Sequence, residues 1–362
     1  MPLEDWDDLV GAEFADCSVP VTLCDGVLTV VAASRARAAQ LRASRYELLG
    51  RIRTTLGEQM VTSLQIVDPT VAMTGEYALL ELLQPTMDQI DALDAAGARR
   101  IPTGFAEFDL LTSGGLEPGT LTVLAGYPGA GSSTLALGFA RAAALRHGIP
   151  TAYFTLKASP IAVTQRLRSA EAGIALNSIQ TGLISAADRK TLKRCTSEID
   201  HAPLQIRRPP DHDVTVLAEQ IIELAEAGTR LIVIDPLDRI TDSGERPWEG
   251  QEREAAEVTR QLKALALDSD TVIVTTAHLA SPRQRTDFRP HLSDIRESGS
   301  IAHVADLVVL IHRLSLWTDD QPRGAEVDLI FAEHRHGPTN VEISVEHQLH
   351  LCRLIEMRFP HV

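Results

Sequence analysis

The sequence is poor in cysteine and contains no long hydrophobic run. Four of its 362 residues are cysteines, and their spacing is not that of metal ligands, so we expect buried thiols in a reducing compartment. No uninterrupted apolar stretch reaches the length of about 18 residues that a membrane-spanning helix requires. The first residues are acidic and lack the basic start and apolar core of a secretion signal. We therefore expect a cytoplasmic protein that does not associate with membranes.

Positive charge is also scarce. The chain has 34 Lys and Arg residues against 49 Asp and Glu residues, which gives a net charge of −15. A protein that coats nucleic acid through its overall charge would be basic, because phosphate contacts require local positive charge. That class is excluded, although an acidic protein can still carry a basic patch. The length favours about two domains, each long enough to bury its own core.

A glycine-rich loop, Gly126–Thr134, lies between an apolar run and a helical pattern. It has the frame of the phosphate-binding motif GxxxxGK[ST], with Gly126 and Gly131 in register, but Ser132 stands where the motif requires lysine. A strand, a glycine turn and a helix N-terminus still direct backbone N–H groups toward an anion. The predicted nucleotide-binding residues are Gly126, Gly129, Gly131, Ser132, Ser133 and Thr134.

The first 69 residues have the pattern of a small α+β domain. Alternating apolar segments flank Asp25-Gly26, a dipeptide suited to a tight hairpin turn, and Ser34 is suited to cap a helix. The pattern predicts a helix, two strands, a helix and a strand, at residues 3–16, 19–23, 27–32, 34–56 and 61–67.

Arginine is concentrated in the second of these helices. Residues 1–33 hold seven acids and no Lys or Arg, whereas residues 34–56 hold six arginines and one acid, Glu47. The pattern fits a solvated helix face, since arginine forms helices well, and it also fits a surface for nucleic acid or an acidic partner. The residues predicted to bind DNA here are Arg35, Arg42 and Arg45.

Short motifs run through the same region: Trp6-Asp-Asp-Leu-Val-Gly11, Val19–Val30, Ala39-Gln-Leu-Arg42, Leu48-Leu49 and Leu56-Gly57. Together they resemble the DciA family (DUF721), which are bacterial partners of the replicative helicase. The resemblance implies a KH-like domain at residues 1–69 that is associated with helicase loading and DNA binding. The region has no GxxG loop, so a KH-type clamp on nucleotides is not expected.

Residues 70–100 are expected to form a connector. Thr86 is suited to cap a short helix over Met87–Ala95, which Gly97 would end. A helix this short is unstable alone, so we expect it to dock on another surface.

From residue 101 onward, strand and helix patterns alternate, as is typical of an α/β fold with a mostly parallel sheet. The predicted strands are 121–125, 151–155, 204–207, 231–234, 271–275 and 307–311, with a later hairpin of 328–332 and 341–345. The predicted helices are near 134–147, 160–172, 186–199, 213–227 and 249–268. This order fits a RecA-like P-loop domain at residues 101–362.

Longer motifs follow one another in this second region: Ile101–Phe105, Leu116–Gly119, Ala202–Leu204, Ile232–Leu237, Leu292–Ile301, Ala305-Asp306 and His336–Thr339. Together they resemble the C-terminal motor domain of DnaB-type replicative helicases, and the resemblance covers residues 86–357. It implies hexameric rings that hydrolyse ATP between subunits, with Mg²⁺, and move on single-stranded DNA. It also implies that the connector helix packs on a neighbouring subunit.

The resemblance assigns roles to particular residues. Ser133 aligns with the hydroxyl that binds Mg²⁺, and Asp235 with the Walker B acid that supports the metal. Lys157 stands where the family has its catalytic glutamate, and a protonated lysine cannot act as a base. Glu333 replaces a lysine that acts in trans, whereas Arg335 remains at the position of the arginine finger.

Two interpretations of these replacements are open. In the first, the site has decayed after losing its use. In the second, Lys157 supplies near the γ-phosphate the positive charge that Ser132 no longer gives, so that ATP is bound and not cleaved. His278 stands at the family's phosphate-sensing glutamine, where it either donates a hydrogen bond to phosphate or is a partly buried histidine with a local partner.

DNA contacts are also expected in the second region. The resemblance implies that one loop faces the channel of the ring. In this chain that loop contains Arg283, Arg285 and Arg289, which are predicted to bind DNA. We favour these three over Arg246 and Arg253, because neighbouring acids dilute the charge of the latter pair.

The sequence therefore predicts a DnaB-related replication protein that binds ATP and Mg²⁺, hydrolyses ATP weakly or not at all, and acts as a DNA- or helicase-binding loader or regulator. The expected partners are single-stranded DNA, a DnaB-type helicase and further subunits in a homo-oligomer or mixed ring. Two alternatives are an active ATP-dependent DNA helicase and a structural scaffold that binds no nucleotide.

Overall fold

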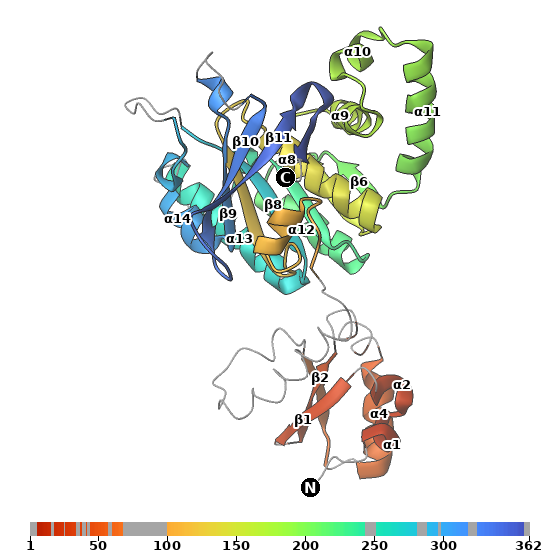
Figure 1. The fold of residues 1–362 in the computed structure, drawn as a ribbon. Coiled ribbons are helices and arrows are strands. Elements are labelled where there is room, and N and C mark those ends of the chain that lie inside the picture. The colour runs from red at the N-terminus through yellow and green to blue at the C-terminus, as the bar shows by residue number, and fades with distance from the viewer. Residues whose placement is uncertain are drawn as a thin grey trace. The chain divides into compact units, whose positions relative to one another are not determined.

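The computed structural model describes residues 6–15, 18–24, 26–33, 37, 41, 44–56, 60–67, 100–242, 251–280, 288–295, 298–317 and 324–357. The chain divides into two compact units, Met1–Ala95 and Ala96–Val362, and each is described by itself (Figure 1). The helix predicted over 87–95 lies outside the described residues.

The N-terminal unit combines a three-stranded sheet with short helices. Its elements are α1 (Trp6–Val10), α2 (Ala12–Ala15), β1 (Ser18–Cys24), β2 (Val27–Ala32), α4 (Arg45–Leu56) and β3 (Ser63–Val67). The strands are ordered β1-β2-β3, with β1 antiparallel and β3 parallel to β2. The predicted small α+β domain is therefore confirmed.

Two helices of this unit differ from the prediction. A single helix over 3–16 is wrong, because Gly11 has a φ of +86° and separates α1 from α2; this left-handed conformation suits glycine and interrupts a helix. A continuous helix from Ser34 to Leu56 is also wrong. Ser44 lies in a turn, and its carbonyl accepts the N–H of Leu48, so the helical segment α4 begins at the next residue.

The core of the N-terminal unit lies on one face of its sheet. Leu28 and Leu64 from the sheet pack with Ile52 of α4, and each of these side chains is no more than 2% exposed. Alternate residues of a strand point to opposite faces. On the other face, Val19 and Val21 of β1 are 64% and 54% exposed.

The second unit is built on a nine-stranded sheet. Its strands are β4 (Leu121–Gly126), β5 (Thr151–Thr155), β6 (Leu204–Arg207), β7 (Leu231–Asp235), β8 (Val272–His278), β9 (Leu307–His312), β10 (Glu326–His334), β11 (Val341–Gln348) and β12 (Arg353–Glu356). Their order is β12-β11-β10-β9-β4-β8-β7-β5-β6. The six strands from β9 to β6 are parallel, and β10, β11 and β12 add antiparallel pairs at one side. The predicted mostly parallel sheet is confirmed.

Helix α7 (Ala106–Leu111) precedes β4, and the remaining helices connect the parallel strands. They are α8 (Ser132–Arg141), α9 (Pro160–Ala172), α10 (Leu176–Thr181), α11 (Ala186–Asp200), α12 (Val214–Glu226), α13 (Gln251–Ser269) and α14 (Ser298–Val304). A π-helical turn, Ala142–Arg146, continues α8. Figure 1 shows α10 and α11 beside α9 at one side of the unit. Within the described residues, no helix combines the length and apolar character needed to cross a membrane.

Both faces of this sheet are buried. One core includes Leu124 of β4 and Phe139 of α8, and the other includes Val123 of β4 and Leu262 of α13. Every residue of β4 is buried, which explains why the parallel strands read as continuous apolar runs. This packing fixes the ends of β4, β7 and β8, from which the candidate site is built.

Candidate functional site

The glycine-rich loop joins the end of β4 to the start of α8. The N–H of Ala130 donates to the carbonyl of Tyr127 at 2.8 Å, which closes a tight turn. Gly129 and Gly131 have φ values of +86° and +115°, and Gly131 is the residue that precedes the first turn of α8. Residues other than glycine rarely adopt such positive φ values. The loop thus directs the N-terminus of a ten-residue helix toward the space beyond β4.

The residues predicted to bind Mg²⁺ lie in contact with each other. The Ser133 hydroxyl, in the first turn of α8, donates to Oδ1 of Asp235 at 2.9 Å. Asp235 ends β7 and is 7% exposed. A hydroxyl and a carboxylate at this position are the oxygen ligands that a P-loop site uses for Mg²⁺, so the residues present fit the metal.

Two further side chains hold Asp235, and sequence reasoning missed both. Tyr153 of β5 donates to Oδ2 at 2.8 Å, and Thr276 of β8 donates to Oδ1 at 2.5 Å. Burial, followed by the nearby Asp235 carboxylate, raises the pKa of Tyr153 well above its usual value, so its phenol keeps its proton and donates. Both residues lie inside apolar strands, and strand pairing alone brings them to Asp235.

Lys157 and His278 line one cavity of about 600 Å³, which is also lined by Pro236, the residue after Asp235. His278 ends β8 and lies in register beside Gly126, and Nδ1 of its ring contacts the carboxylate of Asp238. Lys157 is exposed and follows β5. Two strands, β8 and β7, separate β5 from β4 in the sheet. The roles predicted for these two side chains stay predictions.

Arg313 contacts the glycine-rich loop directly, and the sequence reasoning missed it. It follows β9, whose Ile311 lies in register beside Gly126. Its Nη1 donates to the Gly129 carbonyl at 2.8 Å, and its Nε donates to the Ser315 hydroxyl at 2.9 Å. Burial lowers the pKa of this guanidinium from its usual value. The available signal was a pair of basic side chains, His312 and Arg313, at the end of the apolar run 307–311.

Arg335 lies at the opposite edge of the sheet. Its Nε is 3.3 Å from Oδ1 of Asp306, a buried residue just before β9. Asp306 also receives Nζ of Lys263 at 2.7 Å and the N–H of Leu121, the first residue of β4, at 2.9 Å. The glycine-rich loop follows the last residue of β4, and a six-residue strand extends for about 17 Å. Arg335 therefore cannot reach the loop of its own chain.

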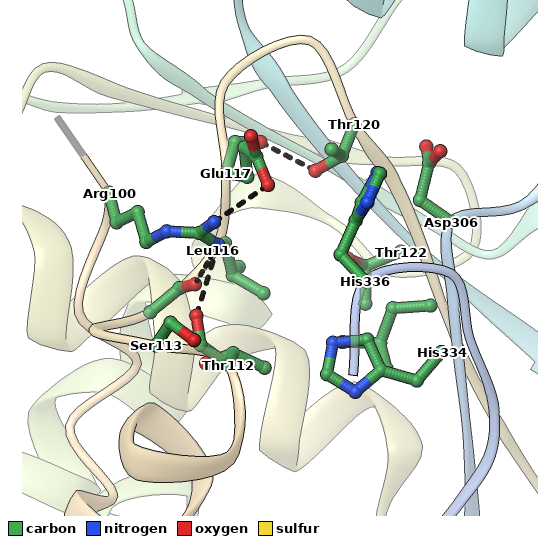
Figure 2. A pocket seen from close by; sticks show the side chains of 12 residues that line it. Arg100, Thr112, Ser113, Leu116, Glu117, Thr120, Thr122, Asp306, His334 and His336 are labelled. Atoms are coloured by element: carbon green, nitrogen blue, oxygen red, sulfur yellow. Dashed lines mark hydrogen bonds and ion pairs between the residues drawn. The ribbon is translucent and has the colours of Figure 1, made fainter. Parts of the chain in front are cut away.

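A small pocket is lined in part by Asp306, the residue that Arg335 contacts (Figure 2). On one side Arg100 donates to Glu117 at 2.8 Å and to the Thr112 carbonyl at 3.0 Å. On the other side are His334 and His336, and burial lowers the pKa of His334. The cavity volume is about 30 Å³, enough for one water molecule, so this pocket is too small for a nucleotide.

The predicted DNA-binding arginines are distributed over both units. Arg45 is an exposed residue at the start of α4, and Arg289 contacts the carboxylate of Glu342 in β11. The side chains that lie outside the described residues are those of Arg35, Arg42, Arg246, Arg253, Arg283 and Arg285. Among the side chains that are described, no group of three or more His, Cys, Asp or Glu residues is placed to bind a metal.

Comparison with known families identifies two matches. Residues 100–355 match the model of the DnaB-like helicase C terminal domain, and residues 2–66 match that of DciA, the Dna[CI] antecedent. The replicative DNA helicase DnaB of Leifsonia xyli subsp. xyli is 39% identical over 283 residues, which cover 77% of this chain and 60% of that relative. The chain thus spans less than two thirds of the length of this relative.

Two solved structures share the fold. An isolated ATPase domain has a TM-score of 0.71 at 22% identity, and the match covers 78% of this chain and all of that domain. A DnaB-like replicative helicase, studied for its interactions with primase, has a TM-score of 0.70 at 20% identity. That match covers 89% of this chain and 75% of the helicase chain.

Proposed function

Because the chain belongs to the DnaB-like helicase family and carries a DciA region before its helicase domain, we propose that it is an ATP-binding member with weak or no hydrolysis. It acts as a loader or regulator that binds DNA or a DnaB-type helicase. The observation that carries this proposal is the contact between Ser133 and Asp235 at a loop whose lysine is replaced by Ser132.

Retained groups support nucleotide binding. The loop glycines adopt the conformations that expose backbone N–H groups to phosphate. Ser133 and Asp235 would hold Mg²⁺, which supplies charge neutralisation at the phosphates when it is bound. The side chains of Tyr153 and Thr276 fix the orientation of the Asp235 carboxylate. These are the contacts that a nucleotide-binding site requires, and their presence together supports retained binding over decay of the site.

Replaced groups support weak turnover. Lys157 puts an ammonium group at the position of the family's catalytic glutamate, so no carboxylate is available there to polarise the attacking water. Ser132 contributes no positive charge to the phosphates, and Glu333 inverts the charge of the family's second trans-acting residue. The changes at Ser132 and Glu333 remove positive charge that would stabilise the transition state, and such electrostatic stabilisation is a main contribution to phosphoryl transfer.

The position of Arg335 supports assembly into a ring. Since it lies about 17 Å from its own loop along β4, it can act only at the site of an adjacent subunit. That subunit is a second copy of this chain or a DnaB-type helicase in a mixed ring. Single-stranded DNA is the proposed ligand of the assembly, contacted by the predicted arginines.

The test is an ATPase assay with and without single-stranded DNA, in the presence and absence of a purified DnaB-type helicase. We expect the chain to add little turnover of its own and to change the activity or loading of the helicase. Robust turnover that DNA alone stimulates would instead support an active helicase, which the retained Ser133, Asp235 and Arg335 favour.

Equilibrium binding of a fluorescent ATP analogue, with Mg²⁺, tests whether the chain binds nucleotide. We expect saturable binding, and its absence at high micromolar ligand would support a scaffold without nucleotide. The Lys157→Ala variant is included. If Lys157 supplies charge to the γ-phosphate, this variant binds ATP more weakly than the parent, and unchanged affinity would contradict that role.

A further inference from the structure

We propose that Arg313 supplies the phosphate-binding charge that the glycine-rich loop lacks at Ser132. The inference rests on the proposed nucleotide site and names the side chain that completes it. A P-loop lysine reaches the β- and γ-phosphates from inside its own loop. In this chain the corresponding cation comes from the neighbouring strand β9.

Strand pairing brings Arg313 to the loop. β4 and β9 run parallel, with Gly126 beside Ile311, so their carboxyl ends meet at one edge of the sheet. Arg313 stands two residues beyond Ile311, just as the loop begins beyond Gly126. Its Nη1 reaches the Gly129 carbonyl at 2.8 Å, which puts the guanidinium in contact with the turn that precedes α8.

The guanidinium retains donors for a ligand. Arginine has five N–H donors in a planar fork. The contacts to Gly129 and Ser315 use two of them, which leaves three for phosphate oxygens. A planar fork binds phosphate with two parallel hydrogen bonds, which lysine cannot do.

The surrounding structure holds Arg313 in place. The short 3-10 turn Leu314–Leu316 follows it directly, and the side chain of Leu316 lies against Gly129 of the loop. The side chain is partly buried, and burial lowers its pKa, but the usual pKa of arginine is so high that the group stays charged. Partial removal from water strengthens the attraction between a guanidinium and a phosphate.

The other two candidate cations are placed less well. Lys157 follows β5, which two strands separate from β4. Arg335 lies at the far end of β4 and bonds to Asp306. Arg313 differs from both because it contacts the loop within the same chain.

The experiment compares ATP, ADP and AMP binding to the full chain and to four variants, in the presence of Mg²⁺. Arg313→Gln removes the charge and keeps a side chain that can donate to Gly129. We expect at least a tenfold loss of ATP affinity and a smaller loss for AMP, because the missing charge faces the terminal phosphates. Arg207→Gln is the matched control, an arginine at the end of β6 that bonds to Gln205, and it is expected to bind all three ligands like the parent.

A second change tests the exchange of roles. Adding Ser132→Lys to Arg313→Gln restores the lysine of the motif, and we expect it to recover most of the ATP affinity. If Arg313 only braces the loop, Arg313→Gln weakens all three ligands equally and the added lysine recovers nothing, which would overturn the inference. The same holds if Arg313→Gln binds ATP like the parent.

Two controls separate the possible failures. Thermal unfolding of each variant shows whether the domain is folded, and Arg313→Lys, which keeps the charge, is expected to retain ATP binding within a few-fold. If the parent itself binds no nucleotide, both the proposed function and this inference fall. If the parent binds and Arg313 is dispensable, this inference alone falls.

Discussion

Three side chains from three separate elements donate hydrogen bonds to the carboxylate of Asp235. They come from α8, β5 and β8, as Ser133, Tyr153 and Thr276. A buried carboxylate needs such donors, because an ion without partners is costly to remove from water. The contacts therefore fix the carboxylate in one orientation, and that orientation is a requirement for supporting a metal ion beside Ser133.

The Thr276→Val variant tests this support. It removes one donor from a charged acceptor, so we expect the free energy of unfolding to fall by about 1.5–3 kcal/mol, as measured by urea denaturation. We also expect Mg²⁺-dependent binding of an ATP analogue to weaken several-fold.

Thr275→Val is the matched control. The Thr275 hydroxyl donates to the carbonyl of Ile234 at 2.9 Å, next to Asp235 but without touching it. Its loss should cost about 0.5–1.5 kcal/mol and leave nucleotide affinity unchanged. Equal losses of affinity in both variants would show that Thr276 has no particular role at the carboxylate.

The residues found from the sequence differ in kind from those that were missed. Ser133 was predicted because it lies in a glycine-rich motif, and Asp235 because it ends an apolar run. Arg313, Tyr153 and Thr276 belong to no local motif, and they reach the site through pairing between strands that are distant in sequence. A single sequence carries little information on which parallel strands become neighbours.

At the scale of elements, Asp306 joins α13 to two strands. Lys263 of α13 bonds both to Asp306 and, at 2.8 Å, to the Gly119 carbonyl before β4. Asp306 precedes β9 and also accepts the first N–H of β4. The two contacts of Lys263 fix the position of α13 at the edge of the sheet where Arg335 lies.

The two cations beside Asp306 should contribute differently. Lys263→Met leaves the buried carboxylate without its inner partner, so we expect a loss of about 3 kcal/mol in the free energy of unfolding. Arg335→Gln should cost no more than about 1 kcal/mol, because the Arg335 side chain is 47% exposed. Urea denaturation of both variants measures the difference, and a larger loss for Arg335→Gln would contradict this assignment.

The elements that the sequence did not predict in the second unit are short. The eight predicted strands of the second unit are present. Five of them, β4, β5, β7, β8 and β9, are buried along nearly their full length, which favours continuous apolar runs. β12, α7, α10 and α14 were missed, and each has four to seven residues. Periodicity cannot be recognised over so few positions, and these elements depend on tertiary packing.

At the scale of the whole molecule, the N-terminal unit has a core built from its own residues, and the second unit has two. A core substitution should therefore act within its own unit. Leu64 is 2% exposed, so Leu64→Ala should destabilise the N-terminal unit by about 2–5 kcal/mol.

Calorimetry of the full chain tests this separation. We expect the transition of the N-terminal unit to shift downward in Leu64→Ala, with ATP-analogue binding by the second unit unchanged. A matched loss of nucleotide affinity would show that the two units depend on each other for stability.

The placement of Arg335 and the glycine-rich loop at opposite ends of β4 has a consequence for stoichiometry. Contacts between such ends are head-to-tail. In a ring, the glycine-rich loop of each subunit would face one neighbour, and Arg335, which follows β10, would face the other neighbour. A copy of this chain among active helicase subunits would impair the site formed at its own loop, because Ser132 and Lys157 replace the motif lysine and the catalytic glutamate, and it would still donate Arg335 to the next site. Because the same copy carries Glu333 in place of the family's trans-acting lysine, it would also weaken that next site, so the number of incorporated copies would act as a graded control on the speed of the motor.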